Sequence, residues 1–371
     1  MPPDADRFAC DARFPGLQTL RLARRAIERA RLDLTGLRVL TEAAVGYRRL
    51  TPVLAALAGA DAVYAVGRDS PQSSRREAEE QTMYLARLAH VDDRVTVVSA
   101  RLQAPLPEID VVTDLPGVRP VDESILRTLS DSAAVSLMAG VADWRPAYVD
   151  VATCRRRGIA VAGVDEEAAG VLSYVPLEVL ADLLDLAVEV TGATVLVAGD
   201  GPAWPHVVQM LSRVGARVLV AAPETPGRVA LFGGEKAGDT LAEESVVGRL
   251  AEADALVLCR PTADGRWVGA GTGVDPARIA TPAPHLAVTG LRADADLRTL
   301  AGAGLRCHPR DDGLFERFPQ PLALLHAAGL RVAEVMARAR RRGSSPLAAE
   351  QRAADEAHAE QLPKDLSGVR R

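Results

Sequence analysis

The stretch VLVAGDGPAWPHVV, from Val195 to Val208, decides the fold of this chain. An apolar run enters a turn that contains Gly199 and Gly201, and the chain then continues with the pattern of a helix. In a dinucleotide-binding unit the first glycine permits the tight turn, and the second lets the backbone approach a pyrophosphate. Pro205 suits the first turn of the following helix. The stretch therefore predicts a strand, a phosphate-type turn and a helix.

The same turn departs from the dinucleotide pattern at two positions. Trp204 stands where a third glycine would let the helix pack closely on the strand, and Pro202 removes a backbone N–H that would otherwise face phosphate. Two interpretations therefore remain open. The turn either binds NAD or NADP, or belongs to a Rossmann unit kept for packing and association.

The strand expected next, residues 217–222, bears on the choice of cofactor. An acidic residue at the end of this strand usually holds the ribose 2′-hydroxyl of NAD. Ala222 occupies that place, with Glu224 two residues later and Arg228 beyond it. Glu224 is a candidate for the ribose and Arg228 for a 2′-phosphate, so the sequence leaves NAD and NADP open.

Short apolar runs alternate with helical stretches on both sides of the glycine turn. Short apolar strands separated by helices are typical of parallel sheets with both faces covered. The sequence therefore predicts an α/β protein with two Rossmann-like parallel-sheet domains and a cleft between them. The expected strands are 37–41, 62–66, 95–99, 110–115, 133–138, 159–163, 194–199, 217–222, 255–260 and 285–290, with 228–234 ambiguous.

Length and composition limit the class of protein. The 371 residues suffice for two domains, and a net charge of −5 argues against a general nucleic-acid partner. No apolar run is long enough for a membrane helix, so we expect a cytoplasmic protein without membrane or nucleic-acid partners. The four cysteines lack the spacing of a zinc site, so no metal is expected. Only two lysines occur, which disfavours Schiff-base chemistry.

Two segments preceding the glycine turn carry a family resemblance. IDVVTDLPGVRPVDESILRTLSDSAAVSLMAG (109–140) and YVDVATCRRRGIAVAG (148–163) resemble the substrate domain of the D-2-hydroxyacid dehydrogenase superfamily. Formate and glycerate dehydrogenases belong to that superfamily, and S-adenosylhomocysteine hydrolases share its architecture. The resemblance implies the following plan: a flavodoxin-like substrate domain over 1–165, completed by a helix at 321–342; a Rossmann domain over 166–320; and a flexible tail over 343–371.

The resemblance also implies a set of catalytic residues. In HLAVTGLRADADL (285–297), Arg292 matches the arginine that holds the substrate carboxylate or carbonyl. In LALLHAAGLRVAEV (322–335), His326 matches the histidine that exchanges the proton, and Glu316 is the nearest candidate for its acidic partner.

Candidate substrate-binding residues lie where predicted strands end. Gly140 corresponds to the loop that binds the substrate carboxylate in the family, and a longer loop than usual follows it. Polar groups that follow successive strands converge on one edge of a parallel sheet. The candidates are Glu42, Tyr47, Arg119, Gly140, Trp144 and Arg145.

These observations lead to one main functional hypothesis and two alternatives. The main one is an NAD- or NADP-dependent oxidoreductase, a homodimer by analogy with related folds, that acts on a carboxylate- or carbonyl-bearing metabolite. The first alternative is a non-catalytic binding or scaffold protein with a degenerate cofactor loop. The second is a site for S-adenosylmethionine or another adenosine compound, because a glycine turn alone does not name its nucleotide.

Overall fold

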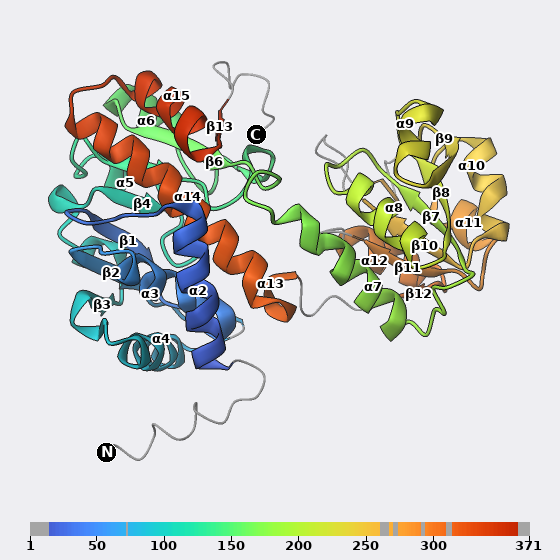
Figure 1. Ribbon diagram of the computed structural model, residues 1–371, viewed down its shortest axis with the longest axis horizontal. Helices are drawn as coiled ribbons and strands as arrows, with labels where there is room; N and C mark the ends of the chain where they lie inside the picture. Colours follow the sequence, from blue (N-terminus) through green and yellow to red (C-terminus); the bar gives the residue numbers. More distant parts are fainter. Residues whose placement is uncertain are drawn as a thin grey trace, which may run out of the picture. The chain divides into compact units, whose positions relative to one another are not determined.

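The computed structural model describes residues 15–71, 73–259, 267–269, 274–290, 294–308 and 314–362. The chain divides into two compact units, whose helices and strands are labelled in Figure 1. Unit 1 comprises residues 1–171 and 318–371, and unit 2 comprises residues 172–317. The α/β fold with two mostly parallel sheets, predicted from the alternation of apolar runs, is confirmed.

Unit 1 is built on a seven-stranded sheet in the order β13-β6-β5-β4-β1-β2-β3. All neighbouring strands are parallel except β13, which pairs antiparallel with β6. The flavodoxin-like order is present in β2-β1-β4-β5-β6, and β3 adds one strand beside β2. The strands are β1 (Arg38–Glu42), β2 (Ala62–Val66), β3 (Val95–Val98), β4 (Val111–Thr113), β5 (Ala134–Ser136), β6 (Ala160–Val164) and β13 (Ala359–Gln361).

The direction of strand addition reverses at β1. The chain places β2 and β3 on one side of β1 and then returns to place β4 on the other. In open parallel sheets, ligands bind at such a reversal, outside the carboxyl ends of the strands. The fold thus singles out the ends of β1 and β4 as the place to look for a site in unit 1.

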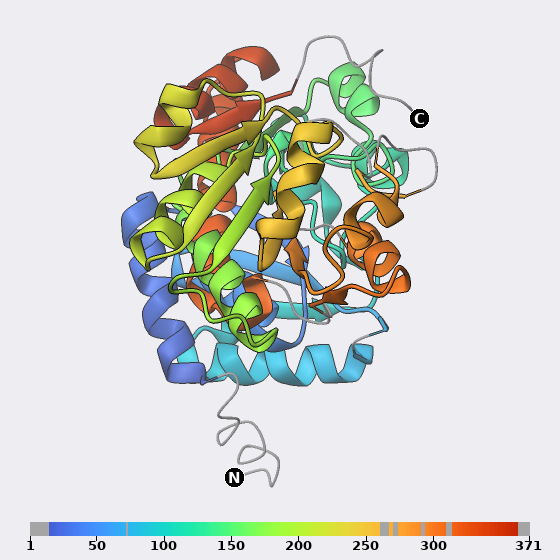
Figure 2. The same cartoon turned by 90° about the vertical axis from the view of Figure 1, so that its right-hand side faces the viewer.

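Helices cover the sheet of unit 1, and α14 packs against several of its elements. It contacts β4, β5, β6, α2, α3 and α15, and sixteen of its 23 residues are buried, which fits its apolar pattern on nearly every face. Figure 2 shows α4 running across the end of α2. The helices are α2 (Gly16–Ala30), α3 (Leu50–Leu57), α4 (Arg75–Ala89), α5 (Glu123–Leu126), α6 (Val151–Arg157), α14 (Pro319–Arg341) and α15 (Pro346–Ala357).

Unit 2 has a six-stranded parallel sheet in the order β12-β11-β10-β7-β8-β9. Numbered within the unit, this is 6-5-4-1-2-3, the arrangement of a dinucleotide-binding sheet, with β7 as its first strand. The strands are β7 (Thr194–Ala198), β8 (Arg217–Ala221), β9 (Gly234–Gly238), β10 (Ala255–Leu258), β11 (Ala287–Gly290) and β12 (Arg306–Cys307). The helices are α7 (Val175–Asp185), α8 (Trp204–Arg213), α9 (Pro226–Leu231), α10 (Glu244–Arg249), α11 (Pro276–Ala280), α12 (Asp294–Gly302) and α13 (Leu314–Arg317).

Short 3₁₀ helices complete the connections. Residues 228–234, for which the sequence left the presence of a strand open, contain the end of α9 and the first residue of β9. The 3₁₀ helices are η1 (Gly46–Arg49), η2 (Asp92–Arg94), η3 (Arg101–Gln103), η4 (Leu106–Glu108), η5 (Val141–Asp143), η6 (Leu172–Tyr174) and η7 (Leu250–Glu252).

The segment after Gly343 is ordered in α15 and β13, contrary to the flexible tail expected from its composition. Ser345 caps α15 by accepting a hydrogen bond from the N–H of Ala348 at 3.2 Å. Glu350 is 1% exposed, pairs with Arg155 and accepts the N–H of Val161 at 2.9 Å. These long-range contacts order a segment whose composition alone resembles a solvated tail.

Candidate functional site

The glycine turn of unit 2 follows β7 and requires glycine at its first position. Gly199 has φ +128°, and a β-carbon there would lie 1.8 Å from the carbonyl oxygen of Cys259. It would also lie 2.5 Å from Cη2 of Trp267. Gly201 follows, and its carbonyl accepts the N–H of Trp204 at 3.1 Å, where α8 begins. The backbone therefore has the strand, turn and helix that the sequence predicted.

Trp204 does not occupy the turn, although the sequence placed it at the third glycine position. Its side chain is 2% exposed, and its ring meets that of Phe232 edge to face with centroids 5.4 Å apart. Trp204 therefore packs in the core of unit 2. The side chain that lies against the turn is Trp267, which sequence reasoning missed because it stands 68 positions after Gly199.

At the end of β8, Ala222 is fully buried and its carbonyl accepts a hydrogen bond from the Lys236 ammonium. Lys236 also lies 2.5 Å from Asp239. Glu224 and Arg228 form an ion pair at 3.4 Å. The two cations of this region, Lys236 and Arg228, thus each have an acidic partner.

In unit 1, Glu42 ends β1 at the reversal of strand order. It is 4% exposed, and its Oε2 accepts the N–H of Gly117 at 3.0 Å. Its Oε1 is buried without a hydrogen-bond partner among the described residues. Burial raises the pKa of Glu42, although the Gly117 N–H and the charges of Arg48 and Arg119 act against the shift. The shift favours the neutral form of the carboxyl group.

A second buried carboxylate follows β4. Asp114 is 3% exposed, lies 3.0 Å from Arg119, and accepts the N–H of Met138 at 2.7 Å. Burial nevertheless raises the pKa of Asp114. The Arg119 guanidinium lies 3.7 Å from the centroid of the Tyr148 ring, a cation–π contact, and the Arg119 carbonyl accepts a hydrogen bond from Arg68 at 2.8 Å. We call Glu42, Asp114, Arg119 and Tyr148 the switch-point cluster.

Four further predicted substrate residues lie outside the switch-point cluster. Tyr47 is 8% exposed in η1, and Trp144 is a core residue whose indole N–H donates to the Val149 carbonyl at 3.1 Å. Arg145 donates to the Ala142 carbonyl at 3.0 Å. The Gly140 N–H donates to Glu166 at 3.2 Å.

The loop after Gly140 carries a second such contact. The N–H of the next residue, Val141, donates to Glu360 of β13 at 2.6 Å. Acidic side chains of the chain itself therefore accept hydrogen bonds from two backbone N–H groups of the loop that the family resemblance assigns to a substrate carboxylate.

The structure places His326 within α14, away from solvent. His326 is 3% exposed, and its Nδ1 lies 2.6 Å from the hydroxyl of Thr51. Burial, with a smaller effect of the Arg48 charge, lowers the pKa of His326 to about 3. A histidine with this pKa is neutral near pH 7. Arg292 lies outside the described residues, as does the side chain of Glu316, whose backbone belongs to α13.

Comparison with known proteins now bears on this geometry. A dipicolinate synthase structure from Bacillus subtilis superposes with a TM-score of 0.58 at 14% identity, covering 84% of this chain and 99% of that one. Its Bacillus halodurans counterpart gives 0.55 at 15% identity, covering 80% and 96%. The chain therefore has the fold of these two structures. No protein-family model and no curated protein sequence matches it.

Within the described ranges, no group of three His, Cys, Asp or Glu side chains is arranged to hold a metal ion. Over the same ranges, no helix has the length and apolar character needed to cross a membrane. The switch-point cluster supplies buried ionisable groups at the strand reversal of unit 1.

Proposed function

We propose that the chain is an NAD- or NADP-dependent oxidoreductase that acts on a carboxylate- or carbonyl-bearing metabolite. The observation that carries the proposal is the strand order of unit 2, in which a glycine turn follows the first strand, β7, and leads into α8. A nicotinamide bound there would supply hydride transfer. The backbone of the turn fits a pyrophosphate, with Gly199 and Gly201 in its first two glycine positions.

In this proposal the switch-point cluster binds the substrate. Arg119 supplies a positive charge for a carboxylate or for the oxygen on which charge develops, and Tyr148 orients its guanidinium. Glu42 exchanges the proton in place of His326, because its raised pKa and unpartnered Oε1 suit a proton donor.

The end of β8 favours NADP over NAD. No acidic residue ends the strand, and Lys236 and Arg228 supply two cations within reach of the region where a 2′-phosphate would lie. When NADP binds, Lys236 and Arg228 would leave their ion pairs with Asp239 and Glu224 and pair with the 2′-phosphate instead.

A non-catalytic binding protein is the second candidate, and Trp267 favours it. The tip of its indole lies 2.5 Å from the place where a β-carbon on Gly199 would be, so the ring packs against the turn. Pro202 also lacks the N–H that a phosphate would accept.

The deciding experiment is calorimetric titration of the full chain with NAD+, NADH, NADP+ and NADPH. Gly201→Trp serves as the blocked control, and Lys236→Met tests the preference for NADP. Saturable nucleotide binding that is lost in Gly201→Trp would support the oxidoreductase proposal. A lower affinity for NADP in Lys236→Met would support the preference for NADP. Absence of binding by all four nucleotides would favour the non-catalytic binding protein.

A further inference from the structure

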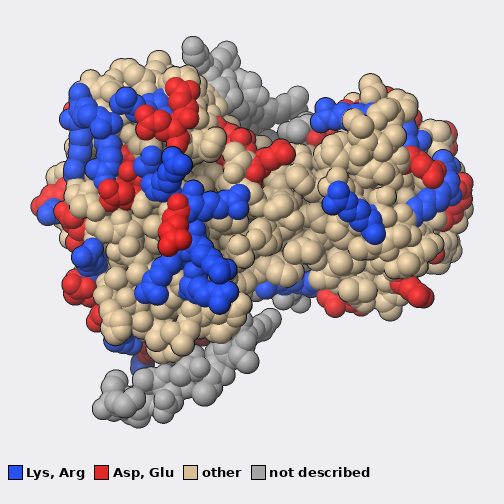
Figure 3. Space-filling view, in the orientation of Figure 1, with Lys and Arg blue, Asp and Glu red and all other residues tan. Residues whose placement is uncertain are grey.

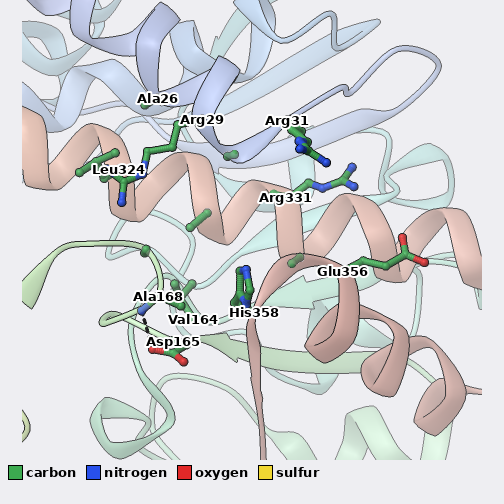
Figure 4. Close-up of a pocket in the computed structure, with 14 residues that line it drawn as sticks. Ala26, Arg29, Arg31, Val164, Asp165, Ala168, Leu324, Arg331, Glu356 and His358 are labelled. Atoms are coloured by element: carbon green, nitrogen blue, oxygen red, sulfur yellow. Dashed lines mark hydrogen bonds between the residues drawn. The ribbon is translucent and has the colours of Figure 1, made fainter.

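A cavity of about 380 Å³ lies within unit 1, away from the switch-point cluster. The end of α2, the segment after β6, the middle of α14 and the end of α15 line it (Figure 4). Six of its fourteen lining residues are alanines, whose short side chains leave room between the polar lining residues. Its size is within the range of small-molecule pockets.

Cationic side chains surround this hollow. Arg29, Arg31 and Arg331 all line it, together with His358. In Figure 4 the guanidinium groups of Arg31 and Arg331 extend to one end of the cavity, and Arg29 lies toward the other. Basic side chains also gather on the outer surface of unit 1 over α2 and α14 (Figure 3). The local field therefore attracts anions.

The acidic residues at the cavity already have partners. Glu356 pairs with Arg352 at 3.0 Å, and Asp165 accepts two backbone N–H groups of the turn that follows it, each at 2.9 Å. Arg331 pairs with Glu334 at 2.7 Å but keeps a buried Nε without a partner among the described residues. Within the same residues, Arg29 and Arg31 have no ion pair. Among the described lining residues, two arginines without an ion pair, Arg29 and Arg31, therefore stand against one carboxylate without one, Asp165, and the net charge is positive.

Two lining residues adopt a backbone conformation that their side chains disfavour. Arg31 ends α2 and His358 ends α15, each with φ +51° in the left-handed region. Glycine is the residue that helix C-termini favour in this conformation, because a β-carbon is strained there. The Arg31 N–H already closes the helix end by donating to the Glu28 carbonyl at 3.1 Å. Helix capping alone therefore does not explain why an arginine and a histidine stand at these positions.

We propose that this cavity binds a small organic anion that carries at least two carboxylate or phosphate groups. The guanidinium groups of Arg29 and Arg31 bind its oxyanions, Arg331 contributes its charge, and the alanines contact its apolar body. None of Glu42, Asp114 and Arg119 lines the cavity, so this site is separate from the proposed substrate site.

The test is calorimetric titration of the full chain with citrate and with inorganic pyrophosphate, in a buffer free of both, with acetate as the monovalent reference. Arg31→Gly removes the guanidinium and also the strained β-carbon, so it should weaken binding about tenfold or more without lowering the melting temperature. Ala30→Glu places a carboxylate among the lining residues and should abolish binding. Stronger binding of citrate or of pyrophosphate identifies the carboxylate or the phosphate as the preferred oxyanion.

Two controls make the outcome specific. Arg25→Gln removes the same charge from an exposed residue of α2 that does not line the cavity, and it should change affinity less than twofold. Gly201→Trp should leave binding of both probes unchanged, because the glycine turn belongs to unit 2. Failure of both probes to bind above the acetate level would overturn the proposal. So would equal weakening by Arg31→Gly and Arg25→Gln, or loss of binding in Gly201→Trp.

Discussion

Removing the His326 imidazole should change how the stability of the protein depends on pH. Burial lowers the pKa of His326 from 6.5 to about 3, so the folded state binds fewer protons than the unfolded state between these values. Stability is therefore lost as pH falls below about 6.5, at about 1.4 kcal/mol per pH unit. By pH 4.5 the loss due to His326 alone reaches about 3 kcal/mol.

The measurement is urea unfolding of the wild type and of His326→Leu at several pH values from 7.5 to 4.5. Leucine fits the apolar surroundings, and the Thr51 hydroxyl keeps the Arg48 carbonyl as an acceptor at 3.3 Å. At pH 7.5 the variant should be less stable by about 1 kcal/mol, because one hydrogen bond is lost. On acidification the wild type should lose stability faster than the variant.

A second variant separates the hydrogen bond from the titration. Thr51→Val leaves His326 in place without its hydroxyl partner, so it should lower stability at every pH by about 1–3 kcal/mol while keeping the steep acid dependence. Parallel pH profiles for the wild type and His326→Leu would refute the reasoning. They would mean that His326 titrates alike in the folded and unfolded states, which would make it again a candidate for proton exchange.

Three further changes test the fold and the sites. Gly199→Ala should destabilise by more than about 3 kcal/mol in urea unfolding, whereas Gly192→Ala, which shares a positive φ but has open space around it, should cost about 1 kcal/mol. Glu42→Gln should stabilise the protein at pH 8 but not at pH 4. The gain in the free energy of unfolding at pH 8 is about 1.4 kcal/mol for each pH unit by which burial raises the pKa of Glu42. Equal effects of the substitution at pH 8 and pH 4 would contradict this prediction. Glu350→Ala should cost about 3–5 kcal/mol by leaving Arg155 unpaired, and a negligible loss would show that the C-terminal helix is not held by this contact.

The sheets could be predicted from the sequence because their strands are buried on both faces. In β7 and β10 nearly every residue is inaccessible to solvent, so each strand reads as an unbroken apolar run. The C-terminal segment could not be predicted in this way. Its order depends on Glu350 meeting Arg155 about 195 positions earlier, and local composition contains no trace of such a contact.

The sites show the same division between local and long-range information. The position of Glu42 at the end of a predicted strand was enough to nominate it, because parallel strands bring their carboxyl ends to one edge. The burial of His326 was not predictable, because a histidine at a family-like position gives no sign that Thr51 and an apolar core enclose it. Trp267 was not predicted for a similar reason, since only the folded backbone shows which indole contacts Gly199.

The net charge of the switch-point cluster depends on protonation. With both carboxylates ionised, the two negative charges of Glu42 and Asp114 would exceed the single positive charge of Arg119. The cluster would then repel an anionic substrate. Burial raises the pKa of both acids, and each shift favours the neutral form. Protonation of Glu42, whose Oε1 has no described partner, leaves Arg119 facing a single acid at 3.0 Å. A carboxylate ligand that displaces Asp114 from Arg119 would then find a cation and a proton donor together, which is the pairing that reduction of a carbonyl requires.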